Sequence, residues 1–149
     1  MEIETKRLKL IACNPEFVSK ISPREYEIGN HIKEYLGELK NDSSIQGWGI
    51  WFVVNKNNNN IIGDIGFKGK PINNMVEIGY GITPSSQKSG YATEAVKAII
   101  DWAFSFNQVE KIIAECLDDN IPSIKVLEKM KMKRVEQNNN MLKWELIKM

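Results

Sequence analysis

Residues that bind transition metals are scarce in this sequence. It holds one histidine and two cysteines, and no Cys-x-x-Cys or His-x-x-x-His spacing brings such side chains together. We therefore expect no metal site. Cys116 lies inside the apolar run 112–117, which favours a buried free thiol over a disulfide or a nucleophile.

Long apolar runs and an excess of one charge are also absent. No stretch approaches the roughly 18 apolar residues of a membrane-spanning helix, and the charged start lacks the apolar segment of a signal peptide. Twenty Lys and Arg against nineteen Asp and Glu leave a formal charge of +1, so neither nucleic acid nor a membrane is an expected partner. The composition is typical of one soluble cytoplasmic domain spanning residues 1–149.

The patterning of apolar residues predicts an α/β protein with a mixed sheet and helices on both faces. Runs rich in β-branched and aromatic residues predict strands at 7–12, 48–54, 61–67, 75–82, 111–117, 133–136 and 141–147. Helical spacing and capping residues predict a short helix after Asn14 and longer helices at about 30–40, 91–106 and 120–130. Strand-helix-strand order predicts parallel pairing between the strands near residues 76 and 112.

The segment 77–95 passes from a strand through a glycine-bearing loop into a helix, with no acidic residue between positions 78 and 93. Backbone N–H groups in the first turn of a helix have no intrahelical partner, and the helix dipole adds positive potential, so the segment favours a phosphate as ligand. Glu77, Gly79 and Gly81 share one face of the strand, where the glycines let a ligand lie against the backbone. A buried strand followed by an ordinary helix cap is the other interpretation.

This loop resembles the acetyl-CoA loop of the GNAT family of acyl-CoA-dependent N-acyltransferases, which reads Gln or Arg, two residues, Gly, one residue, then Gly or Ala. Gln87, Gly90 and Ala92 match that order. The string Gly90-Tyr-Ala-Thr-Glu-Ala, together with Glu77-Ile-Gly-Tyr, is similar to the branch that modifies ribosomal-protein N-termini.

A second block strengthens the resemblance. Asn120-Ile-Pro-Ser-Ile-Lys-Val-Leu-Glu-Lys129 matches the segment Asn-x-x-Ala/Ser-x-x-x-x-Glu-Lys that follows the fifth strand in the family. The resemblance covers the chain from Ile3 to about Leu146. It implies the GNAT fold, in which a mostly antiparallel sheet contains a splayed parallel pair of strands.

The resemblance also implies where acetyl-CoA binds. In the family its pantetheine arm lies between the two splayed strands, against backbone groups that a bulge exposes in the first of them, here the strand 76–82. The implied contacts are main-chain groups of Ile82 and a loop that surrounds the pyrophosphate, made of Gln87, Lys88, Ser89, Gly90, Tyr91, Ala92 and Thr93. Asn120 would hold the pantetheine arm. Gly90 would be needed because a Cβ atom there would collide with the pyrophosphate. A solvated Lys88 is an equally good interpretation of that residue.

The activity implied is transfer of an acetyl group from acetyl-CoA to the primary amine of a protein N-terminus or small molecule, by direct attack in a ternary complex. Such a reaction needs a base for the amine and a proton for the departing thiolate. Glu77 is the candidate base, acting through water, or it only positions the amine by its charge. Ser123 is the candidate proton donor, although a serine there is also an ordinary capping residue. Leu127 occupies the position where many relatives carry a tyrosine.

The sequence leaves several alternatives open. An acetyltransferase for a small amine and a non-catalytic acyl-CoA-binding sensor both fit the loop, whereas a P-loop enzyme does not, because no Gly-Lys-Ser/Thr ends it. The chain fits a monomer or a homodimer. His31 is interpreted as an exposed helix residue, Asp64 as a residue that faces the cleft, and Lys131 replaces a glycine that usually ends the last long helix of the family.

Overall fold

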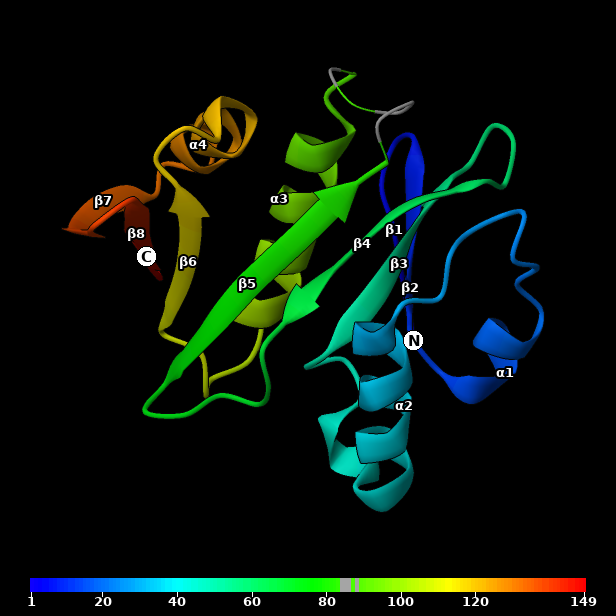
Figure 1. Cartoon of the computed structure of the whole chain (residues 1–149). Helices are drawn as coiled ribbons and strands as arrows, with labels where there is room; N and C mark the ends of the chain where they lie inside the picture. Colours follow the sequence, from blue (N-terminus) through cyan, green and yellow to red (C-terminus); the bar gives the residue numbers. More distant parts are fainter. Residues whose placement is uncertain (84–86, 88) are drawn as a thin grey trace.

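The predicted strands assemble into one mixed sheet (Figure 1). The computed structural model describes residues 1–83, 87 and 89–149, and these residues form an eight-stranded sheet in the order β1-β2-β3-β4-β5-β6-β8-β7. Its strands are β1 (Glu2–Glu4), β2 (Leu8–Ala12), β3 (Ile50–Asn55), β4 (Ile61–Phe67), β5 (Met75–Ile82), β6 (Lys111–Leu117), β7 (Lys133–Asn138) and β8 (Met141–Ile147). Neighbouring strands are antiparallel except β5 and β6, which are parallel. The predicted parallel pairing is confirmed.

Helices cover both faces of the sheet, as the sequence predicts (Figure 1). On one face lie α1 (Pro15–Ser19), α2 (Asn30–Asn41) and the short 3-10 helix η1 (Ser43–Ile45), and on the other lie α3 (Tyr91–Phe104) and α4 (Ile121–Lys129). Ile32 and Tyr35 of α2 pack in a buried cluster with Phe52 of β3. Val96 and Ile99 of α3 belong to a larger buried cluster on the opposite face.

Capping residues define where the short helices begin. The Asn14 side-chain oxygen accepts a hydrogen bond of 2.8 Å from the Phe17 N–H, and Pro15 occupies the first turn of α1. The Asn120 side-chain oxygen accepts one of 3.2 Å from the Ser123 N–H at the start of α4. Both caps confirm the predicted helix starts, because they satisfy N–H groups that have no partner inside the helix.

The parallel strands β5 and β6 pair only in their first halves. Their register runs from Met75 opposite Lys111 to Ile78 opposite Ala114, and the two strands then diverge (Figure 1). On its other edge β5 keeps a single register with β4, in which Gly79 lies opposite Gly66 and Gly81 opposite Asp64. The bulge that the family resemblance implied for β5 is therefore not seen in these pairs, and the sheet opens by divergence of β5 and β6.

Some boundaries differ from the sequence expectations. The strand β1 was not predicted, because a run of three residues with a single apolar side chain carries little strand signal. The helix α3 ends two residues before position 106. Cys13 and Cys116 are both buried and free, as expected for Cys116. No helix in the part of the chain that the structure describes is long and apolar enough to cross a membrane.

Candidate active site

The loop after β5 leads into the N-terminus of α3. Gly90 caps this helix with φ of +79°, a left-handed conformation that residues with a Cβ atom adopt only under strain. The first intrahelical hydrogen bond runs from the Glu94 N–H to the Gly90 oxygen at 3.1 Å. The N–H groups of the predicted contacts Tyr91, Ala92 and Thr93 precede that bond and lie at the positive end of the helix dipole. The left-handed backbone conformation therefore favours glycine at position 90, in addition to the expected contact with the pyrophosphate.

Two further predicted contacts shape this loop. The Gln87 side-chain amide donates a hydrogen bond of 3.0 Å to the carbonyl oxygen of Ile82, so it ties the loop back to the end of β5. The Ser89 carbonyl oxygen accepts a hydrogen bond of 2.9 Å from Arg7. The predicted contact at Lys88 lies outside the described residues.

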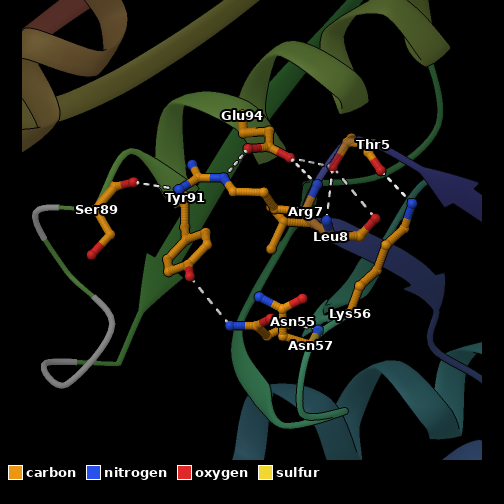
Figure 2. Close-up of polar contacts among 9 residues, drawn as sticks. All are labelled: Thr5, Arg7, Leu8, Asn55, Lys56, Asn57, Ser89, Tyr91 and Glu94. Carbon is orange, nitrogen blue, oxygen red and sulfur yellow. Dashed lines mark hydrogen bonds and ion pairs between the residues drawn. The ribbon is translucent and has the colours of Figure 1, made fainter.

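Arg7 belongs to this site, although its sequence context gave no indication of it (Figure 2). Its Nε atom lies 2.7 Å from Glu94 Oε1, and its backbone N–H donates to Glu94 Oε2 at 2.9 Å. The guanidinium carbon stands 4.4 Å from the centre of the Tyr91 ring. A Cβ atom at Gly90 would lie 3.3 Å from Arg7 Nη2, so the guanidinium group flanks the N-terminus of α3.

The acidic residue in the first turn of α3 is neutralised by these contacts. Burial alone would raise the pKa of Glu94, but hydrogen bonds from Thr5 and Arg7 and the charge of Arg7 together lower it below its ordinary value. Glu94 is therefore ionised at neutral pH and paired. The Tyr91 hydroxyl accepts a hydrogen bond of 3.3 Å from the Asn55 side chain, which fixes the ring beneath Arg7 (Figure 2).

A cavity of about 200 Å³ lies where β5 and β6 diverge, below the N-terminus of α4. Asn120 and Ser123 border it, so the structure brings both predicted residues to the opening in the sheet. The Tyr80 hydroxyl, from β5, donates to the Ser123 carbonyl oxygen at 3.4 Å and borders the same cavity. Burial raises the pKa of Tyr80, so this hydroxyl keeps its proton at neutral pH.

A larger cavity of about 900 Å³ lies on the α2 side of the same strands. Its floor is the part of β4 and β5 where Gly81 lies opposite Asp64 and Gly79 opposite Gly66. A Cβ atom added at Gly79 or Gly81 would meet nothing within 4 Å. The two glycines therefore leave open space above the backbone, as the sequence interpretation expected.

Glu77 precedes this floor on β5, two residues before Gly79. Its Oε2 atom is 2.6 Å from the ammonium nitrogen of Lys68, which borders both cavities. The Glu77 side chain is 22% exposed and that of Lys68 is 64% exposed, so solvent screens the ion pair from the lysine side. The candidate base is thus neutralised by a lysine that the sequence analysis did not single out.

Asp64 lies on the floor and faces the large cavity, as expected. The Tyr26 hydroxyl donates a hydrogen bond of 2.7 Å to Asp64 Oδ2, and His31 Nε2 lies 3.3 Å from Oδ1. Burial, followed by the hydrogen bond to Asp64 and its charge, raises the pKa of Tyr26, so the hydroxyl remains a donor. His31 is exposed, as expected, but it also contacts Asp64.

The sequence matches other proteins over most of its length. Residues 4–133 match the family described as "Acetyltransferase (GNAT) domain". The chain is 40% identical over 106 residues to the uncharacterized N-acetyltransferase YjdG of Bacillus subtilis, a match covering 70% of this chain and 61% of that protein. It is 30% identical over 144 residues to the uncharacterized N-acetyltransferase YnaD of the same species, covering 90% of this chain and 84% of that one.

The fold is shared with solved structures. RimL, titled a ribosomal L7/L12 alpha-N-protein acetyltransferase and solved in complex with coenzyme A, superposes with a TM-score of 0.74 at 16% identity, over 99% of this chain and 98% of that one. From the match over residues 4–133 and the two related sequences, this chain belongs to the GNAT acetyltransferase family.

Proposed function

We propose that this protein is an acetyl-CoA-dependent N-acetyltransferase, a single domain over residues 1–149, that acetylates the primary amine of a protein N-terminus or small molecule. The observation that carries the proposal is the opening between β5 and β6 beyond Ile78 and Ala114, which has the N-terminus of α3 beside it and cavities on both sides. Two substrates can meet at such an opening from opposite faces of the sheet, as direct attack in a ternary complex requires.

The residues present fit acetyl-CoA. The N–H groups of residues 91–93 and the Arg7 guanidinium offer donors and positive charge for a pyrophosphate, and Ser89, Gly90 and Lys88 complete the proposed loop. Gln87 holds this loop against Ile82. Asn120 retains a side-chain amide donor beyond its capping oxygen, at the border of the cavity where the pantetheine arm would lie. Acetyl-CoA supplies the acetyl group as a thioester.

Glu77 and Ser123 are the proposed catalytic residues. Glu77 would take the surplus proton of the amine through water, on the face of β5 that carries Gly79 and Gly81. The Lys68 ammonium group, which pairs with its carboxylate at 2.6 Å, borders both cavities. Ser123 borders the opening from the other side and would donate the proton that the departing thiolate needs. The attacking nitrogen forms a bond to the acetyl carbon as the carbon–sulfur bond breaks.

The acceptor is proposed from the relatives. RimL is titled an alpha-N-protein acetyltransferase, which supports a protein N-terminus as one acceptor class. The match to YjdG spans 61% of that protein and points to N-acetyl transfer without naming an acceptor.

The test is release of free thiol from acetyl-CoA in the presence of a panel of amines and amino-terminal peptides, with CoA affinity measured in parallel. We expect thiol release with at least one acceptor and acetylated product in matching amount. A flat result across the panel together with retained CoA binding contradicts catalysis and favours the acyl-CoA sensor. If neither thiol release nor CoA binding is detected, the proposal is wrong altogether.

A further inference from the structure

One carboxylate that the proposed chemistry does not use borders the larger cavity. We propose that Asp64, held by Tyr26 and His31, is the group that binds the ammonium ion of the acceptor before it loses its proton. This inference rests on the proposed function and specifies its acceptor side. The ammonium ion can belong to a small amine or to a peptide N-terminus, because both present the same group.

The Asp64 carboxylate is fixed from two sides. Tyr26 donates to Oδ2 at 2.7 Å, and its ring packs edge-on against Phe52, with the ring centres 6.1 Å apart. His31 approaches from the first turn of α2, with Nε2 3.3 Å from Oδ1. The Asp64 side chain is only 21% exposed, so a cation that reaches it interacts in a medium with less screening than bulk water. The carboxylate is thus held in place before any ligand arrives.

Asp64 also lies beside the open part of the cavity floor. It is the register partner of Gly81 on β5, and neighbouring side chains on one face of an antiparallel pair stand about 5 Å apart. A ligand above Gly81 therefore lies within reach of the Asp64 carboxylate. Glu77 stands four residues further back along β5, roughly 13 Å at the rise of a strand. Glu77 is also paired with Lys68 at 2.6 Å, whereas the partners of Asp64 are a neutral hydroxyl and a histidine.

The surrounding charges favour a cation as well. Glu34 and Glu38, spaced one turn apart on α2, border the same cavity as Asp64. The basic residues bordering it among the described residues are Lys68, which is paired with Glu77, and His31. Carboxylates therefore outnumber unpaired basic groups around the space above Gly81. Such a lining selects against anionic acceptors and lowers the free energy of a bound ammonium ion.

The test is calorimetric titration of the CoA-saturated protein with three probes. These are spermidine, an alanine-initiated hexapeptide without lysine or arginine, and the same peptide with an acetylated N-terminus. We expect wild-type protein to bind spermidine or the free peptide, which identifies the source of the ammonium ion, and not the acetylated peptide. Asp64→Asn should weaken that binding about ten- to a hundredfold, because a hydrogen bond to a charged group is lost. Tyr26→Phe, which keeps the ring packing, should weaken it by a smaller factor.

The control is Asp101→Asn, which removes the same charge from α3, where Asp101 pairs with Lys97 at 2.8 Å. It should leave probe binding unchanged, and all variants should keep wild-type CoA affinity and melting temperature within a few degrees. Equal binding of the bound cation by Asp64→Asn and wild type overturns the inference. Measurable binding of the acetylated peptide overturns it as well, and so does a failure of the wild-type protein to bind either spermidine or the free peptide. If thiol release fails while Asp64-dependent cation binding persists, the proposed function falls and the cation site stands. If thiol release persists with an unchanged acceptor KM in Asp64→Asn, only the inference falls.

Discussion

Arg7 and Glu94 are 87 residues apart in the sequence, and their side chains form an ion pair of 2.7 Å that joins the start of β2 to the first turn of α3. Thr5 and the Arg7 backbone add hydrogen bonds to the same carboxylate. The pair neutralises an acid beside the proposed pyrophosphate site and holds the guanidinium group against Ser89 and Tyr91. The N-terminal segment is therefore part of the site.

Removal of this carboxylate should destabilise the protein in a pH-dependent way. Glu94→Gln should lower the free energy of unfolding by about 1 to 2 kcal/mol near neutral pH, because it leaves the donors on Arg7 and Thr5 with a weaker acceptor. The pKa of Glu94 is lowered in the folded state, so its contribution is present above the unfolded pKa and is lost as pH falls through the folded one. Urea unfolding at about pH 7 and about pH 3 measures the difference in the free energy of unfolding between wild type and Glu94→Gln. This difference should shrink at acidic pH.

Asp101→Asn is the matched control on the same helix. Its pair with Lys97 is about two-thirds exposed on both sides, so the change should cost only a few tenths of a kcal/mol. Equal effects of the two substitutions near neutral pH, or a gap for Glu94→Gln that widens in acid, would contradict the role assigned to the Arg7 pair.

Most of the fold could be predicted because its signals are local. Strands β4 and β5 have the predicted bounds, since β-branched runs bordered by asparagine and glycine need no distant information. The caps at Asn14 and Asn120 depend on contacts three residues away. The divergence of β5 and β6 was implied by family resemblance, and the structure shows it without the implied bulge.

The site was predictable only where it follows one stretch of chain. The loop at 87–93 forms a continuous motif, so its residues could be named, although Lys88 lies outside the described residues. Asp64 was expected to face the cleft, but the role of Arg7 and the contacts of Asp64 with Tyr26 and His31 could not be predicted, because the partners lie 87, 38 and 33 residues apart. An arginine after a short charged segment carries no sign of the helix that it will contact. Only the packing of helices and loops onto the sheet brings such residues together.

The proton donor can be tested by comparing two hydroxyls. Ser123→Ala should lower turnover by more than about threefold, and up to about 10² for a general acid, with little change in CoA affinity. Tyr80→Phe removes the hydroxyl that lies 3.4 Å from the Ser123 carbonyl oxygen and keeps the ring. Steady-state kinetics of thiol release checks both. A full loss in Tyr80→Phe with an unaffected Ser123→Ala would give the role to the tyrosine.

The base can be tested through the pH dependence of turnover. Glu77→Gln should lower turnover by about 10² to 10⁴ and flatten its rise with pH, because glutamine does not titrate. Lys68→Met removes the ammonium group 2.6 Å from the same carboxylate and should change turnover by a smaller factor. A Glu77→Gln protein with normal turnover and a raised KM for the acceptor would mean that the glutamate only positions the amine.

Lys131 offers a stability prediction independent of function. It has φ of +64° directly after α4, where its N–H donates to the Glu128 oxygen and the Met132 N–H to the Leu127 oxygen. This pattern closes a helix with a left-handed residue, which costs a lysine roughly 1 kcal/mol. Lys131→Gly should therefore raise the melting temperature by about 2 to 4 °C.

Gly37→Ala, which removes a glycine from a helix, provides the comparison for Lys131→Gly. Gly37 lies within α2, and a Cβ atom there would meet nothing within 4 Å, so Gly37→Ala should also stabilise, by about 0.5 to 1 kcal/mol. Thermal unfolding of the two variants under one condition checks both. A lower melting temperature for Lys131→Gly together with a higher one for Gly37→Ala would contradict this prediction. At position 131 the entropy that glycine adds to the unfolded state would then outweigh the backbone strain that it relieves.

Calorimetric titration of CoA into Gly90→Val tests whether CoA binds at the N-terminus of α3. The variant places a side chain between Arg7 and the N-terminus of α3, so CoA affinity should fall at least about tenfold, or about 1.4 kcal/mol. Gly69→Val is the control, because Gly69 also has positive φ, +111°, but lies in the connection between β4 and β5, away from this loop. We expect both variants to fold and only Gly90→Val to lose CoA affinity. Unchanged affinity in a folded Gly90→Val protein would place the nucleotide elsewhere and contradict the account.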